Sequence, residues 1–136
     1  MTPASTPNCN NRLSALLTTI QTLRGKDGCP WDRRQNSHSL LKYLQEECQE
    51  LIEAIKKDDH VNICEELGDL LYLIVMFSEI GNDQGYFHLG DVLSTINEKL
   101  IRRHPHVFAD QSYENEEQLA AQWEAIKAEE KRNNSV

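Results

Sequence analysis

Four acidic side chains at helical spacing are the residues of this chain best suited to chemistry. They form two pairs, Glu47 with Glu50 and Glu66 with Asp69, and the members of each pair are three residues apart. Side chains at that spacing project from one face of a helix, where like charges repel each other. Because oxygen-only ligation favours a hard cation, we expect the four carboxylates to be catalytic residues that bind Mg2+, with Mn2+ as a possible substitute. The alternative is a solvated acidic face.

The position of Glu47 is the strongest local argument for a metal site. It falls on the apolar stripe of its helical segment, among Leu40, Leu44, Leu51 and Ile55. A charge beside a core is costly unless something neutralises it. Four carboxylates also exceed the need of one Mg2+, so we expect two or more ions when substrate is present. One carboxylate would then be left to orient or deprotonate a water.

A basic cluster lies near the end of a later helical segment. It consists of Lys99, Arg102 and Arg103, and His104 and Pro105 follow directly. Arginine forks match the oxygens of phosphate, so the cluster is a candidate phosphate clamp. The structural alternative is a basic last turn that complements the helix dipole. Because the chain also contains a candidate carboxylate site for metal, we favour phosphate binding over the structural alternative.

Two tryptophans and a lysine are further candidates for substrate binding. Trp31 lies in a polar loop within the run Cys-Pro-Trp-Asp, where a packing plug is the more common role. Trp123 and Lys127 lie one turn apart on a polar helix. Trp123 could stack on a base with Lys127 near a phosphate, although docking of the helix is the simpler role for this tryptophan.

The apolar periodicity is close to 3.6 residues almost throughout, which predicts an all-α fold. We expect four to five helices, with the carboxylates between two antiparallel ones. The third helix can be capped by Asp58 or Asp59 and stops at Gly81 and Asn82. It is apolar nearly all round from residue 70 to 77, which indicates a central helix or a subunit interface. The expected helices are 11–24, 39–57, 61–80, 88–103 and 114–131, with a loop over 25–37.

Composition limits the possible partners. The chain of 136 residues has a formal net charge of −8, so we expect neither a nucleic acid polymer nor a membrane as a partner. No apolar run approaches the ~20 residues that span a bilayer, and we expect a cytoplasmic protein. Four cysteines without metal-site spacing are expected to be reduced thiols. We predict one domain over residues 11–131, with a loosely ordered segment 1–10 and a frayed tail 132–136.

At these residues the chain resembles the MazG family of nucleoside triphosphate pyrophosphohydrolases. The resemblance extends from about residue 12 to residue 131, and its motifs occur in the family's order. The matching stretches are 28–32 (GCPWD), 43–50 (YLQEECQE), 65–71 (EELGDLL), 99–108 (KLIRRHPHVF) and 123–127 (WEAIK).

The resemblance implies Mg2+-dependent cleavage of an NTP or dNTP between the α and β phosphates, which gives a monophosphate and pyrophosphate. It implies that the acidic quartet holds Mg2+ and that Lys99 and Arg103 contact phosphates. Trp123 and Lys127 would help to hold the nucleotide. It also implies a homo-oligomer, either a dimer or a tetramer. We expect the subunit interface to be formed by the second and third helices.

Departures from the family pattern bear on which nucleotide is preferred. Asn36 stands where threonine is common, and Cys48 and Gln49 stand where alanine and tyrosine are common. Longer relatives carry two tandem copies of the domain, and this chain carries one. Two alternatives stay open: a narrower dUTP or phosphoribosyl-ATP pyrophosphohydrolase, and a non-catalytic helical module stabilised by metal.

Overall fold

The computed structural model describes residues 8–134, and within that range every regular element is a helix. This confirms the all-α prediction. The chain divides into two compact units, one up to Leu89 and one from Gly90 onward. The helices are α1 (Cys9–Leu23), α2 (Pro30–Arg34), α3 (Leu41–Lys56), α4 (His60–Asp83), α5 (Leu89–Arg103), α6 (Pro105–Phe108) and α7 (Glu116–Asn134).

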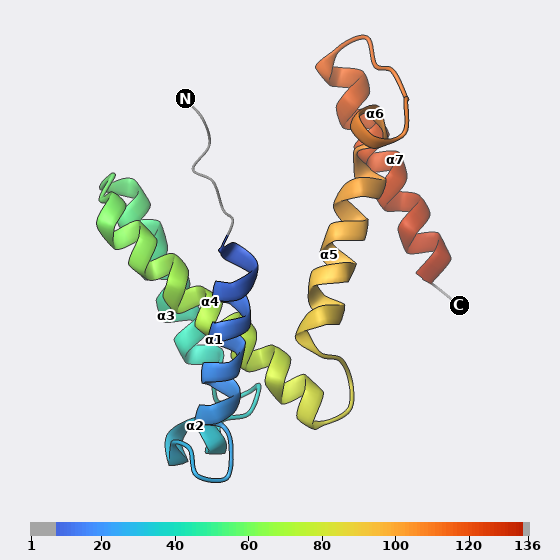
Figure 1. The fold of residues 1–136 in the computed structure, drawn as a ribbon. Coiled ribbons are helices and arrows are strands. Elements are labelled where there is room, and N and C mark those ends of the chain that lie inside the picture. Colours follow the sequence, from blue (N-terminus) through green and yellow to red (C-terminus); the bar gives the residue numbers. More distant parts are fainter. Residues whose placement is uncertain (1–7, 135–136) are drawn as a thin grey trace. The chain divides into compact units, whose positions relative to one another are not determined.

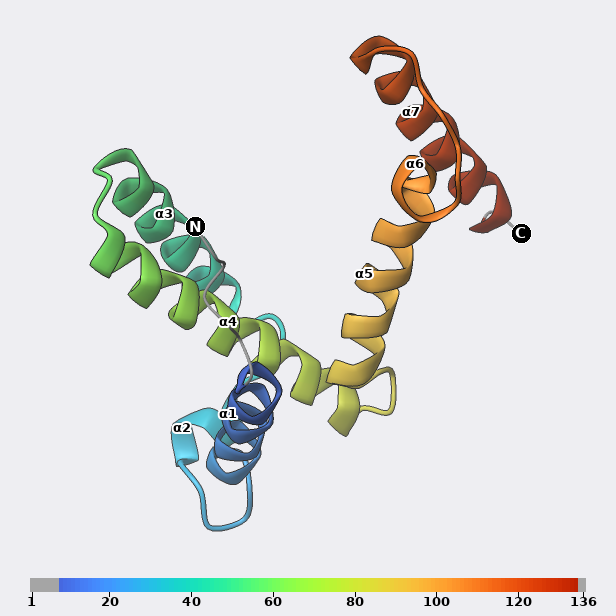
Figure 2. The ribbon, with the colours of Figure 1, turned by 45° about the horizontal axis from the view of Figure 1, so that its top comes forward.

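The helices α3 and α4 form an antiparallel pair, as both views show (Figures 1 and 2). The connection is short, and Asp58 adopts a positive φ of 53° within it. The carboxylate of Asp59 accepts a hydrogen bond from the backbone N–H of Asn62 at 3.2 Å and so caps α4. A connection of this length leaves the two helices adjacent, which places their side chains opposite one another.

The core of the first unit lies where α1 crosses α4 (Figure 2). Its fully buried side chains are Ile20 from α1, Leu40 just before α3, and Val75 and Met76 from α4. Partly buried neighbours, Trp31 among them, pack against this cluster. Burial of these side chains supplies the main free energy that holds the three helices together.

The helix α4 continues beyond the end that the sequence predicted. It passes through Gly81, and the ring of Phe87 lies directly over this residue. A Cβ at position 81 would lie 2.6 Å from that ring, so only glycine allows this approach. The chain turns instead at Gly85, whose φ is 78°. The expected stop at Gly81 and Asn82 is therefore wrong by a few residues.

A short helix, α2, occupies part of the segment that was expected to be a loop. Pro30 occupies its first turn, where the missing N–H of proline leaves no helical hydrogen bond unmade. Asp32 in α2 is buried and accepts a hydrogen bond from the hydroxyl of Tyr72 on α4. Arg24 donates to the backbone oxygen of Asp32 at 2.8 Å and forms an ion pair with Asp83 at 3.0 Å. These bonds attach α2 to the α1–α4 core.

The second unit contains the remaining helices, α5, α6 and α7. As predicted, α5 ends just before His104 and Pro105, and Pro105 then starts the four-residue α6. The helix α7 extends to Asn134, beyond the predicted end at 131. Two ion pairs join α5 to α7 near their C-terminal ends.

The predicted limits of the domain are only partly covered by the described residues. Residues 1–7 and 135–136 lie outside them, and α1 begins at Cys9 within the segment 1–10 that was expected to be loose. A single domain over 11–131 stays a prediction, since the structure defines the two units separately. No helix within residues 8–134 combines the length and hydropathy needed to cross a membrane.

Candidate functional site

Three of the four predicted carboxylates meet between α3 and α4. One ligand oxygen from each of Glu47, Glu66 and Asp69 can be chosen so that all three lie within 4.8 Å of one another. Glu47 is half-buried on the inner face of α3, and Glu66 is buried on the inner face of α4. Each helix therefore places a glutamate where its packing face would otherwise hold an apolar side chain.

Two of these carboxylates carry a buried oxygen that lacks a hydrogen-bond partner. The Oε2 atoms of Glu47 and of Glu66 are buried, and neither has a hydrogen-bond partner. Burial, followed by the nearby carboxyl of Glu66 and the charges of Glu50 and Asp69, raises the pKa of Glu47 to about 7. Burial also raises the pKa of Glu66, and Glu50 and Asp69 add to that increase. The cluster is an electrostatic cost to the protein by itself.

A divalent cation fits this donor set. The ligand atoms are all carboxylate oxygens, which are the ligands preferred by Mg2+ and Mn2+. Two of the carboxylates offer buried oxygens without partners, so a cation would satisfy atoms that are otherwise unsatisfied. Glu47, Glu66 and Asp69 are therefore suited to hold the metal, and metal binding by Glu50 stays a prediction.

Glu50 lies beside this group but is not one of its three members. Its side chain is exposed, and its charge contributes to the raised pKa of both Glu47 and Glu66. A groove of about 520 Å³ runs along the same side of the helix pair. Its lining residues are Gln45, Glu46, Gln49, Glu50, Glu53, Asn62 and Glu66. The groove gives a ligand access to Glu66 and Glu50 from solvent.

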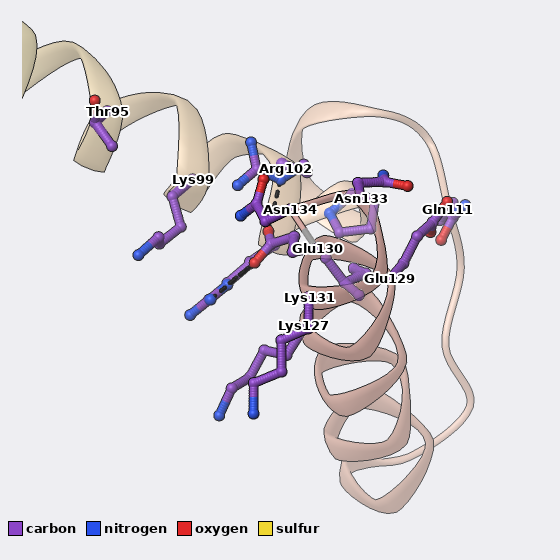
Figure 3. Close-up of a pocket in the computed structure, with 13 residues that line it drawn as sticks. Thr95, Lys99, Arg102, Gln111, Lys127, Glu129, Glu130, Lys131, Asn133 and Asn134 are labelled. Atoms are coloured by element: carbon purple, nitrogen blue, oxygen red, sulfur yellow. Dashed lines mark hydrogen bonds and ion pairs between the residues drawn. The ribbon is translucent and has the colours of Figure 1, made fainter. Parts of the chain in front are cut away.

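The predicted basic residues line a pocket of about 750 Å³ within the second unit. Lys99, Arg102 and Arg103 come from α5, and Lys127 comes from α7. Figure 3 shows Lys99 and Lys127 extending to the same side of this pocket. The structure thus brings together four residues predicted to bind substrate, from two helices.

Sequence reasoning missed Glu130, which lies in this pocket between the two arginines. Its Oε2 accepts from Arg102 Nε at 2.6 Å, and its Oε1 accepts from Arg103 at 2.9 Å. The hydrogen bonds from Arg103 and Arg102 hold the pKa of Glu130 below its usual range. On a polar helix with several glutamates, nothing in the sequence distinguishes this one.

Trp123 contacts two residues at the end of α5. The guanidinium of Arg103 lies over its indole ring at 5.2 Å from the centroid, and His104 meets the ring edge-on at 5.1 Å. These three residues also line a second pocket of the unit, of about 450 Å³. Trp123 therefore docks α7 and lines a cavity at the same time, so both of its predicted roles are compatible with its position.

Trp31 belongs to the first unit, within α2. Its ring meets that of Tyr43 edge-on, with centroids 5.5 Å apart, and it packs against the buried core. Trp31 thus has the packing role that is the more common one for a tryptophan in a polar loop. Substrate binding by Trp31 stays a prediction without a supporting contact.

An all-helical protein with three carboxylates gathered between two antiparallel helices is the class that the geometry defines. A model of the MazG nucleotide pyrophosphohydrolase domain matches residues 35–108, which include α3, α4, α5 and α6. The chain belongs to this family. The resemblance noted from its motifs is thereby confirmed.

Several curated relatives carry the name nucleoside triphosphate pyrophosphohydrolase. The protein of Escherichia coli K12 is 43% identical over 122 residues, which cover 89% of this chain and 46% of the relative. The protein of Thermotoga maritima, whose name adds "pyrophosphatase MazG", is 49% identical over 119 residues, which cover 85% of this chain and 44% of the relative. The chain thus spans less than half the length of these relatives.

A solved structure of similar length shares the fold. It is the crystal structure of a mazG-related protein from Thermotoga maritima, with a TM-score of 0.69 and 30% sequence identity. The match covers 85% of this chain and 98% of that chain.

Proposed function

We propose that this chain is a Mg2+-dependent nucleoside triphosphate pyrophosphohydrolase. It hydrolyses an NTP or dNTP between the α and β phosphates and releases a monophosphate and pyrophosphate. The observation that carries the proposal is the meeting of Glu47, Glu66 and Asp69, with two buried oxygens that lack partners. Membership of the MazG family and the names of its relatives support the same reaction.

Three of the carboxylates bind the metal, and the fourth accepts a proton from the attacking water. Glu47, Glu66 and Asp69 hold the cation, which when bound offsets phosphate charge and makes phosphorus easier to attack. Glu50, exposed beside them, orients the attacking water and accepts its proton. The water oxygen forms a bond to the α-phosphorus, the bond from that phosphorus to the bridging oxygen breaks, and pyrophosphate leaves with the bond electrons.

For the second unit, considered alone, we propose phosphate binding in the basic pocket. Lys99, Arg102 and Arg103 supply positive charge from α5, and Lys127 supplies it from α7. Arginine forks bind phosphate oxygens in pairs, and the lysines act as point charges. Trp123 offers an aromatic surface beside Arg103, which suits a nucleoside.

We also propose that the protein is a cytoplasmic homo-oligomer that assembles through α4. Leu67, Leu71 and Ile74 recur at helical spacing along this helix, and their side chains are 51%, 39% and 40% exposed within the chain. An apolar face of this kind is typical of an oligomer interface. Leu71→Asp should shift the protein to the monomer in analytical ultracentrifugation. Unchanged sedimentation of that variant would contradict an interface on α4.

The experiment that tests the reaction is product analysis on a panel of NTPs and dNTPs, with Mg2+, with Mn2+ and with EDTA. Monophosphate and pyrophosphate in equal amounts, formed only with metal, support the proposal and rank the bases. Activity confined to one nucleotide would place the chain with the narrower pyrophosphohydrolases.

Two other outcomes would overturn the proposal. Diphosphate with orthophosphate would mean that attack occurs at a different phosphorus. No product from any nucleotide, together with stabilisation by metal, would favour the non-catalytic helical module. A variant that lacks a metal ligand, such as Asp69→Asn, is the matched control for contaminating phosphatases, because it should abolish only the activity of this protein.

A further inference from the structure

Glu130 is the most fully compensated carboxylate in the basic pocket (Figure 3). Arg102 Nε donates to its Oε2 at 2.6 Å, while Arg103 donates to its Oε1 from Nε at 3.2 Å and from a terminal nitrogen at 2.9 Å. The side chains of Glu130 and Arg103 are only 15% and 18% exposed. The carboxylate therefore fills part of the two guanidinium forks.

The charge of the pocket is unusual for this protein. Five basic side chains line it against two glutamates, whereas the whole chain has a net charge of −8. Although the protein as a whole is negative, this local excess of positive charge attracts small anions to the pocket. The five basic residues are Lys99, Arg102, Arg103, Lys127 and Lys131.

The bonds to Glu130 use the same chemistry that binds phosphate. A guanidinium recognises carboxylate and phosphate oxygens with the same paired N–H donors. Glu130 thus occupies positions where the oxygens of a phosphate group would bind Arg102 and Arg103. Its single negative charge is smaller than that of pyrophosphate or a triphosphate chain, which makes it replaceable by these ligands.

We propose that Glu130 is an internal competitor for phosphate, and that it restricts the arginine pair to polyphosphate ligands. This inference rests on the proposed phosphate binding in the second unit. A polyphosphate displaces the carboxylate because it gains contacts with several basic residues at once. A single phosphate group gains fewer contacts and leaves Glu130 in place, so Glu130 determines specificity without being a catalytic residue.

Calorimetric titration of pyrophosphate into the protein in EDTA tests this inference. Glu130→Gln should bind pyrophosphate about tenfold more tightly than the wild type, because charge-assisted bonds no longer have to be broken. Orthophosphate should bind this variant measurably and should not bind the wild type. The matched control is Glu129→Gln, which removes the same charge from the same pocket but none of the bonds described above. Its affinity for pyrophosphate should stay within about twofold of the wild type.

Glu130→Asp separates contact from charge and covers a failure of Glu130→Gln to fold. It keeps the charge but is too short to reach both arginines, so it should also bind pyrophosphate more tightly than the wild type. The melting temperature of each variant reports folding.

Three results would overturn the inference. Weaker binding by Glu130→Gln would mean that Glu130 orients the arginines. Equal gains in Glu129→Gln and Glu130→Gln would mean that only overall charge matters. Absence of pyrophosphate binding in every protein would remove the site. None of these results depends on hydrolysis, since EDTA removes the metal that turnover requires. A failure of the proposed reaction would therefore be seen separately.

Discussion

The carboxylates between α3 and α4 and the carboxylate of Glu130 experience opposite electrostatic surroundings. Glu47 and Glu66 have no cationic partner among the contacts described, and their pKa values are raised. Glu130 lies between two arginines, and its pKa is lowered. The same side chain is thus kept uncompensated in one unit and neutralised within the chain in the other.

This difference indicates what each site requires from outside the chain. A cluster of uncompensated carboxylates destabilises the protein alone, so its presence is best explained by an external cation. A carboxylate already paired with arginine needs no external cation. An anion that binds these arginines must instead displace the carboxylate. We therefore expect the first site to respond to metal and the second to respond to phosphate.

The largest expected effect comes from removing one ligand of the uncompensated cluster. Glu66→Gln should lower Mg2+-dependent turnover by at least about 100-fold, since even residues that only support metal ligands are worth about 10- to 100-fold. Without metal the variant should be at least as thermostable as the wild type, because a buried repulsion is relieved. The rate of product formation with Mg2+ measures the first effect, and the melting temperature in EDTA measures the second.

The matched control is Glu65→Gln, which neutralises the exposed neighbour of Glu66 on the same helix. Its turnover should stay close to that of the wild type. If Glu66→Gln retained normal activity, the comparison would fail at its central point, since the cluster would not be the site of the reaction.

The next largest effect is the dependence of stability on pH and on Mg2+. The pKa of Glu47 is raised from 4.5 to about 7, so the folded protein holds this proton more tightly than the unfolded chain does. The contribution of Glu47 to the stability of the fold is therefore fully present below about pH 4.5 and is lost as the pH rises through about 7. The melting temperature in EDTA should fall across this range.

Added Mg2+ should reverse that loss, because the metal binds the ionised carboxylates. At 100 times its dissociation constant a ligand adds about 2.7 kcal/mol of stability, and this gain should be larger at pH 8 than at pH 6. Glu47→Gln is the control, in which both the slope with pH and the response to Mg2+ should shrink. A slope in this variant identical to the wild-type slope would assign the titration to other groups.

How much of this fold could be predicted from the sequence depended on helix length. The longer helices α1, α3, α4, α5 and α7 were predicted because each repeats its apolar face over several turns. The helices α2 and α6 have five and four residues, too few to show a period, and neither was predicted. Each begins at a proline, Pro30 or Pro105, which suits the first turn of a helix. The end of α4 was misplaced because the ring of Phe87 over Gly81 is a tertiary contact.

The candidate site was predicted to a similar degree and for similar reasons. Glu47 was recognisable because it interrupts an apolar stripe within one helix. That Glu66 and Asp69 would meet it, with Glu50 beside them, depended on how α3 and α4 face each other. The role of Glu130 was invisible because its partners lie on another helix, 27 and 28 residues earlier. Local patterns therefore identify single residues, and tertiary structure decides which of them act together.

The smallest expected effect concerns Asp32, another buried carboxylate, whose side chain accepts a hydrogen bond from a hydroxyl. Tyr72→Phe removes the donor to Asp32 and should cost about 1–3 kcal/mol of unfolding free energy, because a buried acceptor loses its bond. Urea denaturation provides the measurement, and Tyr86→Phe, which alters an exposed tyrosine, should leave the free energy unchanged. A loss in Tyr72→Phe would show that a buried carboxylate in this chain requires a local donor. The metal cluster would then differ from Asp32 in lacking one. If Tyr72→Phe were as stable as the wild type, buried carboxylates would be tolerated here without compensation, and the unpaired oxygens of Glu47 and Glu66 would no longer imply a cation.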